Sequence, residues 1–250
     1  MRLEGMKAMV TGAASGFGAG IARALAAEGA LVMVTDLNAE GAAAVAVELP
    51  GAASCAVDVT VPETLEAAVA ACEAQLGGLN IMVANAGIGQ RPAPLADTGA
   101  DVLRQQFEVN AVGAANTCAA ALPALRRSDA GASILITVSG IALMPRPGLY
   151  GYGMSKMAAM YLMKALALEL APERIRVNGL FPAVGDTPML AEFAGGERTA
   201  ENEVVFAEAL PLGRLITPED VGAAAVWLSS PREAGAMTGC ALPVDAGRCI

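Results

Sequence analysis

Short apolar runs recur along the chain, and longer stretches with apolar residues at helical spacing lie between them. Such runs suit strands that are buried on both faces of a parallel sheet. They cover residues 7–11, 31–35, 54–57, 81–84, 133–139 and 176–181, with a short last run near 241–244. The helical stretches cover residues 18–28, 40–49, 63–75 and 152 to 170. The alternation predicts an α/β fold, a doubly wound parallel sheet of about seven strands with helices on both faces.

The chain of 250 residues suits one domain, because no linker, internal repeat or run of like charges divides it. One stretch, residues 186–212, breaks the alternation of strands and helices. It contains Gly195, Gly196 and several charged residues. We predict a single domain over residues 1–250, with a substrate loop or helical lid at 186–212.

The charge balance and the missing residue types narrow the range of partners. A net charge of -9 repels nucleic-acid phosphates and anionic membrane surfaces. Histidine is absent, so histidine-based nucleophilic triads and the commonest transition-metal ligand are excluded. The five cysteines form no C-x-x-C pair, which favours free thiols over a zinc site. We therefore expect no nucleic acid, membrane or metal partner.

Nothing in the sequence predicts export or membrane insertion. The first residues lack the long apolar run and cleavage site of a signal peptide. The Ala-rich run at 112–125 is shorter than the roughly 18 apolar residues of a membrane span, and Pro123 interrupts it. We expect a cytoplasmic protein.

A glycine-rich turn separates the first apolar run from the first helical stretch. Residues 11–18 have the sequence TGAASGFG, with the spacing G-x-x-x-G-x-G. Glycines let the backbone approach a pyrophosphate closely, and the following helix N-terminus offers free N–H groups. A purely structural turn is the alternative. In this context the pattern favours a dinucleotide phosphate site formed by Gly12, Ser15, Gly16, Phe17 and Gly18.

An acidic residue, Asp36, follows the second apolar run. A carboxylate there can accept hydrogen bonds from both ribose hydroxyls of an adenosine, and it would repel a 2′-phosphate. The next residues, Leu37 and Asn38, provide no cation to hold such a phosphate. A helix N-cap is the alternative role of Asp36. We predict NAD rather than NADP, with Asp36 and Leu37 beside its adenosine.

A tyrosine and a lysine lie four residues apart at the start of the long helical stretch. This spacing places Tyr152 and Lys156 on one helix face. A free phenol is a poor base at neutral pH, and a nearby lysine cation lowers its pKa. Tyr152 can then take a proton from an alcohol or return one to an alkoxide. Tyr150 is a rival phenol, but its partner four residues on is Met154, so we assign it to packing.

Together these motifs resemble the short-chain dehydrogenase/reductase family, and the resemblance covers nearly the whole chain. It implies a Rossmann-type fold and a secondary alcohol dehydrogenase or ketoreductase that uses NAD. Besides the glycine-rich turn, the matching residues are Asp58-Val59, Asn85-Ala86-Gly87, Asn110, Ser139, Tyr152 and Lys156.

The resemblance implies a catalytic role for Asn110, Ser139, Tyr152 and Lys156. Ser139 would hydrogen-bond the substrate oxygen, and Lys156 would also contact the nicotinamide ribose. Asn110 would hold a water molecule that links Lys156 to solvent. A strand-end cap for Ser139 and a helix-kink residue for Asn110 are the alternatives. Ser155 is expected to pack as a small helix residue.

The chain departs from the family pattern after the sixth apolar run. The usual Pro-Gly is Pro182-Ala183 here, and Gly185 stands where a bulkier apolar residue is common. Phe17 likewise replaces a more usual aliphatic residue, whereas Thr187 matches the contact to the nicotinamide amide. Pro182, Gly185 and Thr187 are thus expected at the nicotinamide, in a pocket of altered shape.

The candidate substrate-lining residues are mostly apolar, which favours a hydrophobic secondary alcohol or ketone. They are Ile141, Leu143, Met144, Tyr150, Met189, Leu190 and Phe193. Arg91 and Arg146 could hold an acidic group of the substrate. Ordinary solvated arginines are the simpler interpretation of both.

Two other functions compete with this prediction. A 3-oxoacyl thioester reductase would use the same chemistry, with Arg126 and Arg127 helping to dock an acidic carrier. Asp36 argues against it, since such reductases resemble NADPH users. A non-catalytic dinucleotide sensor is less favoured, because the serine, tyrosine and lysine are intact.

The resemblance to the short-chain dehydrogenase/reductase family also implies a tetramer, in which subunits pair through the helix after Asn110 and the helix after Tyr152. Both stretches are Ala-rich and apolar here, which is compatible with pairing across a two-fold axis. We expect a homotetramer.

Overall fold

The computed structural model describes residues 1–250 and has one parallel sheet at its centre. The strands are β1 (Lys7–Thr11), β2 (Leu31–Asp36), β3 (Ala53–Ala56), β4 (Ile81–Ala84), β5 (Ala132–Thr137), β6 (Ile175–Pro182) and β7 (Ala241–Val244). Their order is β3-β2-β1-β4-β5-β6-β7, and all neighbours are parallel. The predicted doubly wound α/β fold is confirmed. Its strand order reverses between β1 and β4, where ligands bind in open sheets of this kind.

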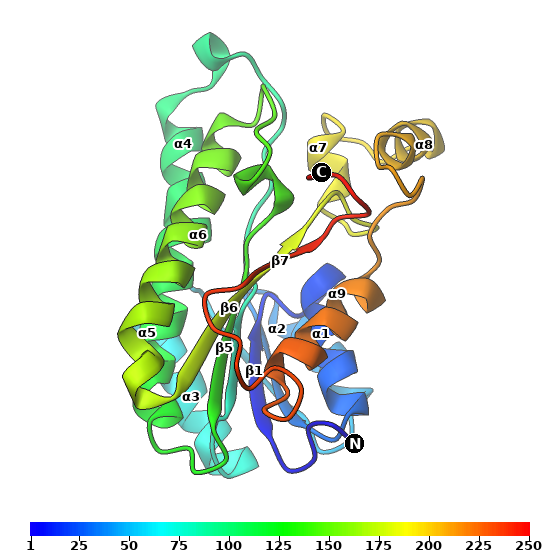
Figure 1. The fold of residues 1–250 in the computed structure, drawn as a ribbon. Coiled ribbons are helices and arrows are strands. Elements are labelled where there is room, and N and C mark those ends of the chain that lie inside the picture. The colour runs from blue at the N-terminus through cyan, green and yellow to red at the C-terminus, as the bar shows by residue number, and fades with distance from the viewer.

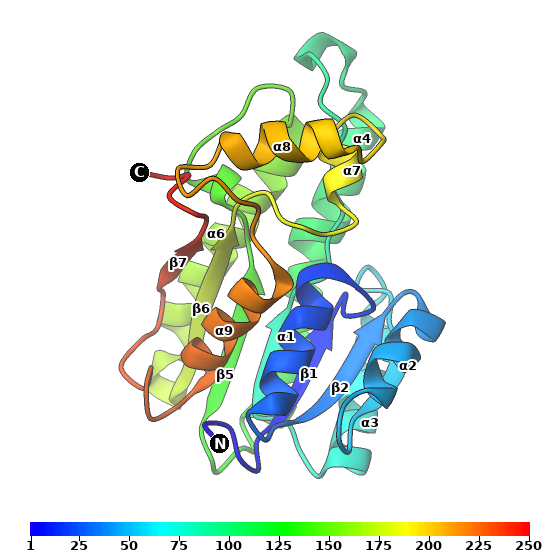
Figure 2. The same ribbon diagram turned by 90° about the vertical axis from the view of Figure 1, so that its right-hand side faces the viewer.

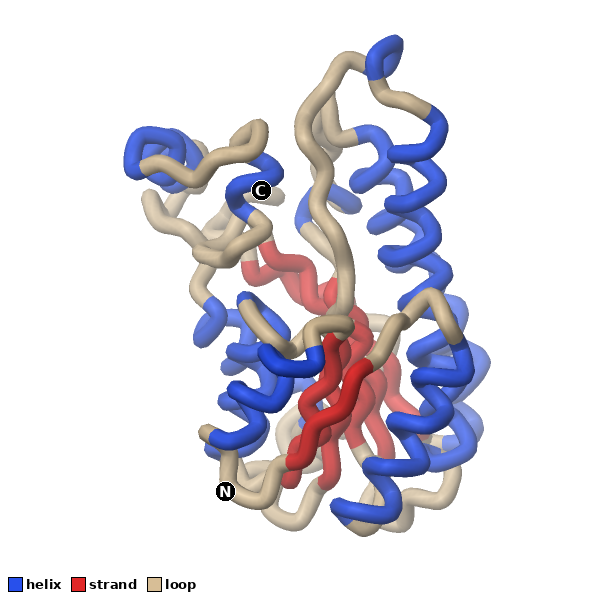
Figure 3. The backbone as a smooth tube through the Cα atoms, turned by 180° about the vertical axis from the view of Figure 1, so that it is seen from behind, coloured by secondary structure: helices blue, strands red, loops and turns tan.

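Helices cover both faces of the sheet (Figures 1 and 2). One face carries α1 (Gly16–Ala27), α2 (Ala39–Val47) and α9 (Pro218–Ser229). The other carries α3 (Pro62–Leu76), α5 (Gly113–Leu125) and α6 (Tyr150–Leu170). The view from behind shows the sheet between two layers of helices (Figure 3). Each face of the sheet has its own buried apolar cluster.

Small residues allow the helices to pack closely. A Cβ on Gly20 of α1 would lie 2.5 Å from the Cβ of Pro218 of α9. A Cβ on Gly222 of α9 would lie 2.8 Å from the carbonyl oxygen of Gly20. Two glycines therefore set the close contact of α1 with α9, which explains part of the Ala and Gly richness of the chain.

A further helix, α4 (Ala100–Phe107), runs through a π-helical turn at Glu108–Val112 directly into α5. Short 3₁₀ turns occupy Leu95–Asp97, Gly140–Ala142 and Ala171–Glu173. Pro123 lies in the last turn of α5, and the helix continues to Leu125. Its missing N–H leaves the carbonyl oxygen of Ala119 without its usual helical partner. No helix is long and apolar enough to span a bilayer.

Several predicted boundaries differ from the structure by one or two residues, and two of them bear on the positions of Ser139 and Tyr152. Strand β5 ends at Thr137 rather than at residue 139, because Ser139 already caps the 3₁₀ turn that follows. Helix α6 begins at Tyr150 rather than Tyr152. Tyr152 thus lies in the first turn of the helix, directly above the end of the sheet.

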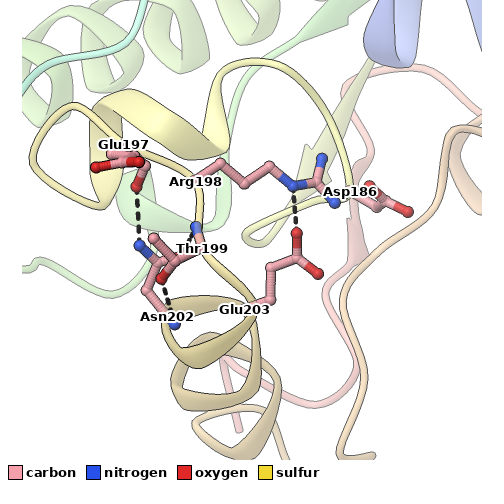
Figure 4. Close-up of polar contacts among 6 residues, drawn as sticks. All are labelled: Asp186, Glu197, Arg198, Thr199, Asn202 and Glu203. Atoms are coloured by element: carbon pink, nitrogen blue, oxygen red, sulfur yellow. Dashed lines mark hydrogen bonds and ion pairs between the residues drawn. The ribbon is translucent and has the colours of Figure 1, made fainter.

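The segment 186–212 forms two short helices, α7 (Leu190–Phe193) and α8 (Ala200–Glu208), beside the C-terminus and above the carboxyl ends of the strands (Figures 1 and 2). Figure 4 shows what holds the segment together: Arg198 lies between Glu203 and Asp186 and pairs with both carboxylates. Thr199 and Asn202 cap the start of α8 reciprocally. The stretch that breaks the alternation of strands and helices is therefore helical itself.

Candidate active site

A cavity of about 810 Å³ opens at the carboxyl ends of the strands. It is lined by every residue that the sequence predicted for the cofactor: Gly12, Ser15, Gly16, Phe17, Gly18, Asp36, Leu37, Asp58, Val59, Asn85, Ala86, Gly87, Tyr152, Lys156, Pro182, Gly185 and Thr187. Ser139 lines it too, whereas Asn110 does not. The fold thus gathers residues from most of the chain around one space.

The glycine-rich turn has a backbone that only glycine adopts easily. Gly12 and Gly16 have φ angles of +65° and +54°. A Cβ on Gly12 would lie 2.7 Å from the Cα of Ala86, so the turn packs directly on the loop after β4. Ser15 precedes α1 and makes no side-chain cap. The first N–H groups of α1 therefore remain free for an anionic ligand such as a pyrophosphate.

The Asp36 carboxylate is held in place by two backbone donors. It accepts hydrogen bonds from the N–H of Ala14 at 3.0 Å and the N–H of Asn38 at 2.9 Å. Each carboxylate oxygen accepts one of these bonds and can accept another, and Asp36 lines the cavity. The helix N-cap, which was the alternative role for Asp36, is Asn38 instead: its side chain accepts a hydrogen bond from the N–H of Gly41 at the start of α2. The arrangement fits the two hydroxyls of a ribose.

The residues matched after β3 and β4 have local structural partners. Asp58 accepts from the backbone N–H and the hydroxyl of Thr60, which hold the pKa of that carboxyl below its ordinary value. Asn85 donates to the carbonyl oxygens of Thr11 and Gly12 and accepts from Thr137. The Asn85 side chain therefore ties the ends of β1, β4 and β5 together and shapes the turn at the edge of the cavity.

Two departures from the family pattern explain each other. A Cβ on Gly185 would lie 2.2 Å from Cζ of the Phe17 ring. The ring thus occupies the space that a bulkier residue 185 would fill, between the glycine-rich turn and the loop after β6. The Phe17 ring therefore forms this part of the cavity wall in place of a bulkier side chain at position 185.

The proton-transfer group, Tyr152 with Lys156, lines the cavity beside the end of β5. Tyr152 and Lys156 are buried, and the lysine Nζ lies 5.8 Å from the centre of the Tyr152 ring. The lysine donates to the carbonyl oxygen of Thr137 at 2.9 Å. Phe193 of α7 packs edge-on against Tyr152, with 5.2 Å between ring centres. The phenol, the ammonium and Ser139 thus meet at the end of β5.

Burial dominates the ionisation of this group in the ligand-free chain. It raises the pKa of Tyr152, and the Ser139 hydroxyl, a hydrogen-bond partner of the phenol, opposes the shift. Burial also lowers the pKa of Lys156 to about 8. The expectation that the lysine lowers the tyrosine pKa is therefore wrong, since desolvation outweighs the hydrogen bond with Ser139.

Asn110 belongs to a buried polar network beside the cavity. It accepts from the N–H of Ile88 at 2.8 Å and donates to the carbonyl of Ile88, to Gln106 and to Ser155. Ser155 in turn donates to the carbonyl oxygen of Tyr152. The π-helical turn carries Asn110 into this position, as π-turns at functional sites often do. Ser155 is thus a network member, not merely a small packing residue.

Sequence reasoning missed the two glutamines of this region. Gln90 is buried and accepts from the backbone N–H of Tyr152 at 2.8 Å. Gln106 is buried and donates to the carbonyl oxygen of Gly89. No local motif marks either one, because each finds its partner only when the fold brings distant segments together: the loop after β4 meets the start of α6, and α4 meets that loop.

The outer part of the cavity is mostly apolar. Of the predicted substrate-lining residues, Ile141, Met144, Met189, Leu190 and Phe193 line it, together with Arg146. Leu143, Tyr150 and Arg91 do not. The lining residues that were missed include Leu149, Val205, Phe206 and Arg248. The last three come from α8 and from the C-terminal segment, and only the fold brings them to the site.

Comparisons with known proteins agree with this geometry. A profile of the family described as Enoyl-(Acyl carrier protein) reductase matches residues 12–248. The chain is 43% identical to 4-formylbenzenesulfonate dehydrogenase of Comamonas testosteroni over 254 residues, with both chains fully covered. It is 39% identical to L-fucose dehydrogenase of Oryctolagus cuniculus, with 98% of this chain and 86% of that one covered.

A solved structure supports the same assignment. The 3-ketoacyl-(acyl-carrier-protein) reductase from Brucella melitensis, complexed with NADH, superposes with a TM-score of 0.92 at 37% identity. The alignment covers 99% of this chain and 100% of that one. With the positive-φ glycines, the free start of α1 and the oriented Asp36, the cavity fits a nicotinamide dinucleotide. The chain belongs to the short-chain dehydrogenase/reductase family of oxidoreductases.

Proposed function

We propose that this protein is an NAD-dependent oxidoreductase that interconverts a secondary alcohol and a ketone, with Tyr152 as the acid/base. The observation that carries the proposal is the single cavity that joins Asp36 and the glycine-rich turn to Ser139, Tyr152 and Lys156. Its outer walls are mostly apolar, which suits a hydrophobic substrate.

Each side chain has a defined task in this proposal. A bound nicotinamide accepts or supplies the hydride. Ser139 donates a hydrogen bond to the substrate oxygen, and Tyr152 exchanges a proton with that oxygen. Lys156 stabilises the phenolate, and Asn110 connects the lysine to solvent through a water molecule. Because burial raises the pKa of Tyr152, ketone reduction should proceed at neutral pH, whereas alcohol oxidation should accelerate as the pH rises.

The test is a screen of secondary alcohols and ketones with NAD⁺ and NADH, followed by absorbance of NADH. The Tyr152→Phe variant should lose turnover by about 100- to 10,000-fold while NADH binding persists. Full activity in that variant would contradict the proposed mechanism. Absence of turnover in the unmodified protein, together with NADH binding, would favour the non-catalytic sensor instead.

NAD is proposed over NADP because the oriented Asp36 would repel a 2′-phosphate. Leu37 is exposed beside it and carries no charge. The NADH complex of the Brucella melitensis reductase supports this choice. A larger kcat/KM with NADPH than with NADH would overturn it.

The second candidate is a 3-oxoacyl thioester reductase, which the same solved neighbour favours by its name. The arginines considered for carrier docking argue against it. Arg126 is paired with Glu173 and Arg127 with Glu73, so neither is free to bind an acidic carrier. Reduction of a 3-oxoacyl thioester at least as fast as that of simple ketones would favour this candidate.

We also propose a homotetramer that pairs α5 and α6. The exposed face of α6 carries an apolar row at helical spacing: Met154, Met157, Tyr161 and Leu168. Tyr161 and Leu168 are 77% and 81% exposed in the single chain, which is unusual for a soluble surface. Analytical ultracentrifugation should show a tetramer for the unmodified protein. The Tyr161→Glu variant should dissociate, whereas the Val47→Glu variant, changed on the exposed side of α2, should remain a tetramer.

A further inference from the structure

The outer end of the cavity holds two arginines that have no acidic partner. Arg146 precedes α6 and Arg248 follows β7, and both line the cavity. The paired arginines of the chain lie elsewhere: Arg2, Arg23, Arg104, Arg126, Arg127, Arg198 and Arg214. Two unpaired cations at one site are notable in a chain with a net charge of -9.

The surroundings hold these guanidinium groups without neutralising them. Arg146 lies over the ring of Phe206, with its Cζ 5.4 Å from the ring centre. A guanidinium nitrogen of Arg248 lies 3.5 Å from the sulfur of Met144. Burial and the charge of Arg248 both lower the pKa of Arg146, so the two cations are close enough to repel each other. An anion between them would relieve this repulsion.

Apolar side chains separate the arginines from the proton-transfer group. Leu149, Met189, Phe193 and Phe206 line this part of the cavity. Glu192 is the acidic residue at this end, and no lysine or arginine nitrogen lies within 4.0 Å of it. Lys156 is engaged with Thr137 at the opposite end. A ligand that extends from Tyr152 through the cavity thus contacts apolar side chains, and its far end reaches the two guanidinium groups.

We propose that Arg146 and Arg248 bind an anionic oxyacid group, a carboxylate or sulfonate, on an apolar substrate whose alcohol or carbonyl lies at Tyr152. This inference rests on the proposed function and specifies the substrate class. Guanidinium groups bind such oxyanions through paired, charge-assisted hydrogen bonds. Both arginines then act in specificity, away from the reacting atoms.

The test compares 4-acetylbenzoate with acetophenone, which differ in the carboxylate alone. The unmodified protein should reduce the acid with a kcat/KM about 10- to 100-fold higher, the range expected for charge-assisted hydrogen bonds. The preference should largely disappear in the Arg146→Met/Arg248→Met variant and persist in part in the double lysine variant. Arg91→Met is the matched control, because Arg91 is exposed and does not line the cavity.

A binding measurement keeps this test independent of turnover. Calorimetric titration of 4-methylbenzoate into the NAD⁺-loaded protein should give a Kd that the double methionine variant weakens about tenfold or more. An unchanged Kd, or equal use of acetophenone by the unmodified protein, would overturn the inference and leave the proposed function intact. Lack of turnover of every ketone, with carboxylate binding preserved, would instead count against the proposed function.

Discussion

The two ends of the cavity are built in different ways. At the dinucleotide end the backbone forms the site: Gly12 and Gly16 adopt positive φ angles, and two N–H groups orient Asp36. These residues directly follow β1 and β2. At the substrate end side chains form the site, and they come from the segment before α6, from 186–212 and from the C-terminus. The first end depends on short local patterns, whereas the second depends on long-range packing. The two ends should therefore respond separately to substitution.

The largest effect is expected at the dinucleotide end. Asp36→Ala combined with Leu37→Arg removes the ribose acceptor and supplies a cation for a 2′-phosphate. The kcat/KM ratio of NAD⁺ to NADP⁺ should fall by about 100-fold or more, since two charge-assisted hydrogen bonds are lost. The relative rates for two different alcohols should stay constant in the same assay. A change in substrate preference would show that the two ends are coupled.

Lys156 lies where the two ends meet, and its burial has an energetic cost. The folded pKa of about 8 lies below the ordinary 10.5, so between these values the unfolded chain binds a proton that the folded chain does not. Stability should therefore rise with pH through this window, by about 3 kcal/mol in all. Urea unfolding of the ligand-free protein at several pH values should show the rise. Lys156→Met should lack it, while Lys164→Met, at an exposed position of α6, should retain it. If the free energy of unfolding changed with pH in the same way in all three proteins, the rise could not be assigned to Lys156.

The close packing of the Phe17 ring against Gly185 can be tested by substitution. Gly185→Val places atoms where the Phe17 ring lies and should lower the free energy of unfolding by about 1–3 kcal/mol. Phe17→Val/Gly185→Val should recover at least half of this loss, which a double-mutant cycle measures as coupling. Gly153→Ala is the matched control, because a Cβ there meets Ile141 at an ordinary 3.7 Å. Additive losses would show that the two positions do not compensate each other.

The smallest effect is expected at Gln90, a positioning residue. Gln90→Leu removes the acceptor of the Tyr152 N–H and should reduce kcat roughly tenfold, as expected for about 1.4 kcal/mol of lost hydrogen bonding. The Kd for NADH should not change, because the dinucleotide end is untouched. Gln75→Leu, an exposed change on α3, serves as the control. Equal losses in kcat and NADH affinity would indicate general disruption instead.

The sequence predicted which residues gather at the dinucleotide end of the cavity, since its signals are local. The glycine spacing, Asp36 and the Tyr152–Lys156 pair each lie within a few residues of a strand end or on one helix face. The substrate end was predicted only in part. Arg248 lies 102 residues after Arg146, and no periodicity links them. Gln90 and Tyr152 are 62 residues apart, so their contact follows from packing of the loop after β4 against the start of α6 and not from any motif.

The strand order has a consequence for the order in which the chain can fold. Strand β1 completes its pairing with β2 and β4 once residue 84 is available. Strand β7 pairs with β6 across 62 positions, from Gly179 to Ala241, and Arg248 follows it. During synthesis the nucleotide half can therefore assemble long before the substrate half, whose closure waits for the last residues to emerge. Truncation of a few C-terminal residues should leave a protein that holds its dinucleotide and has lost its selectivity for substrate.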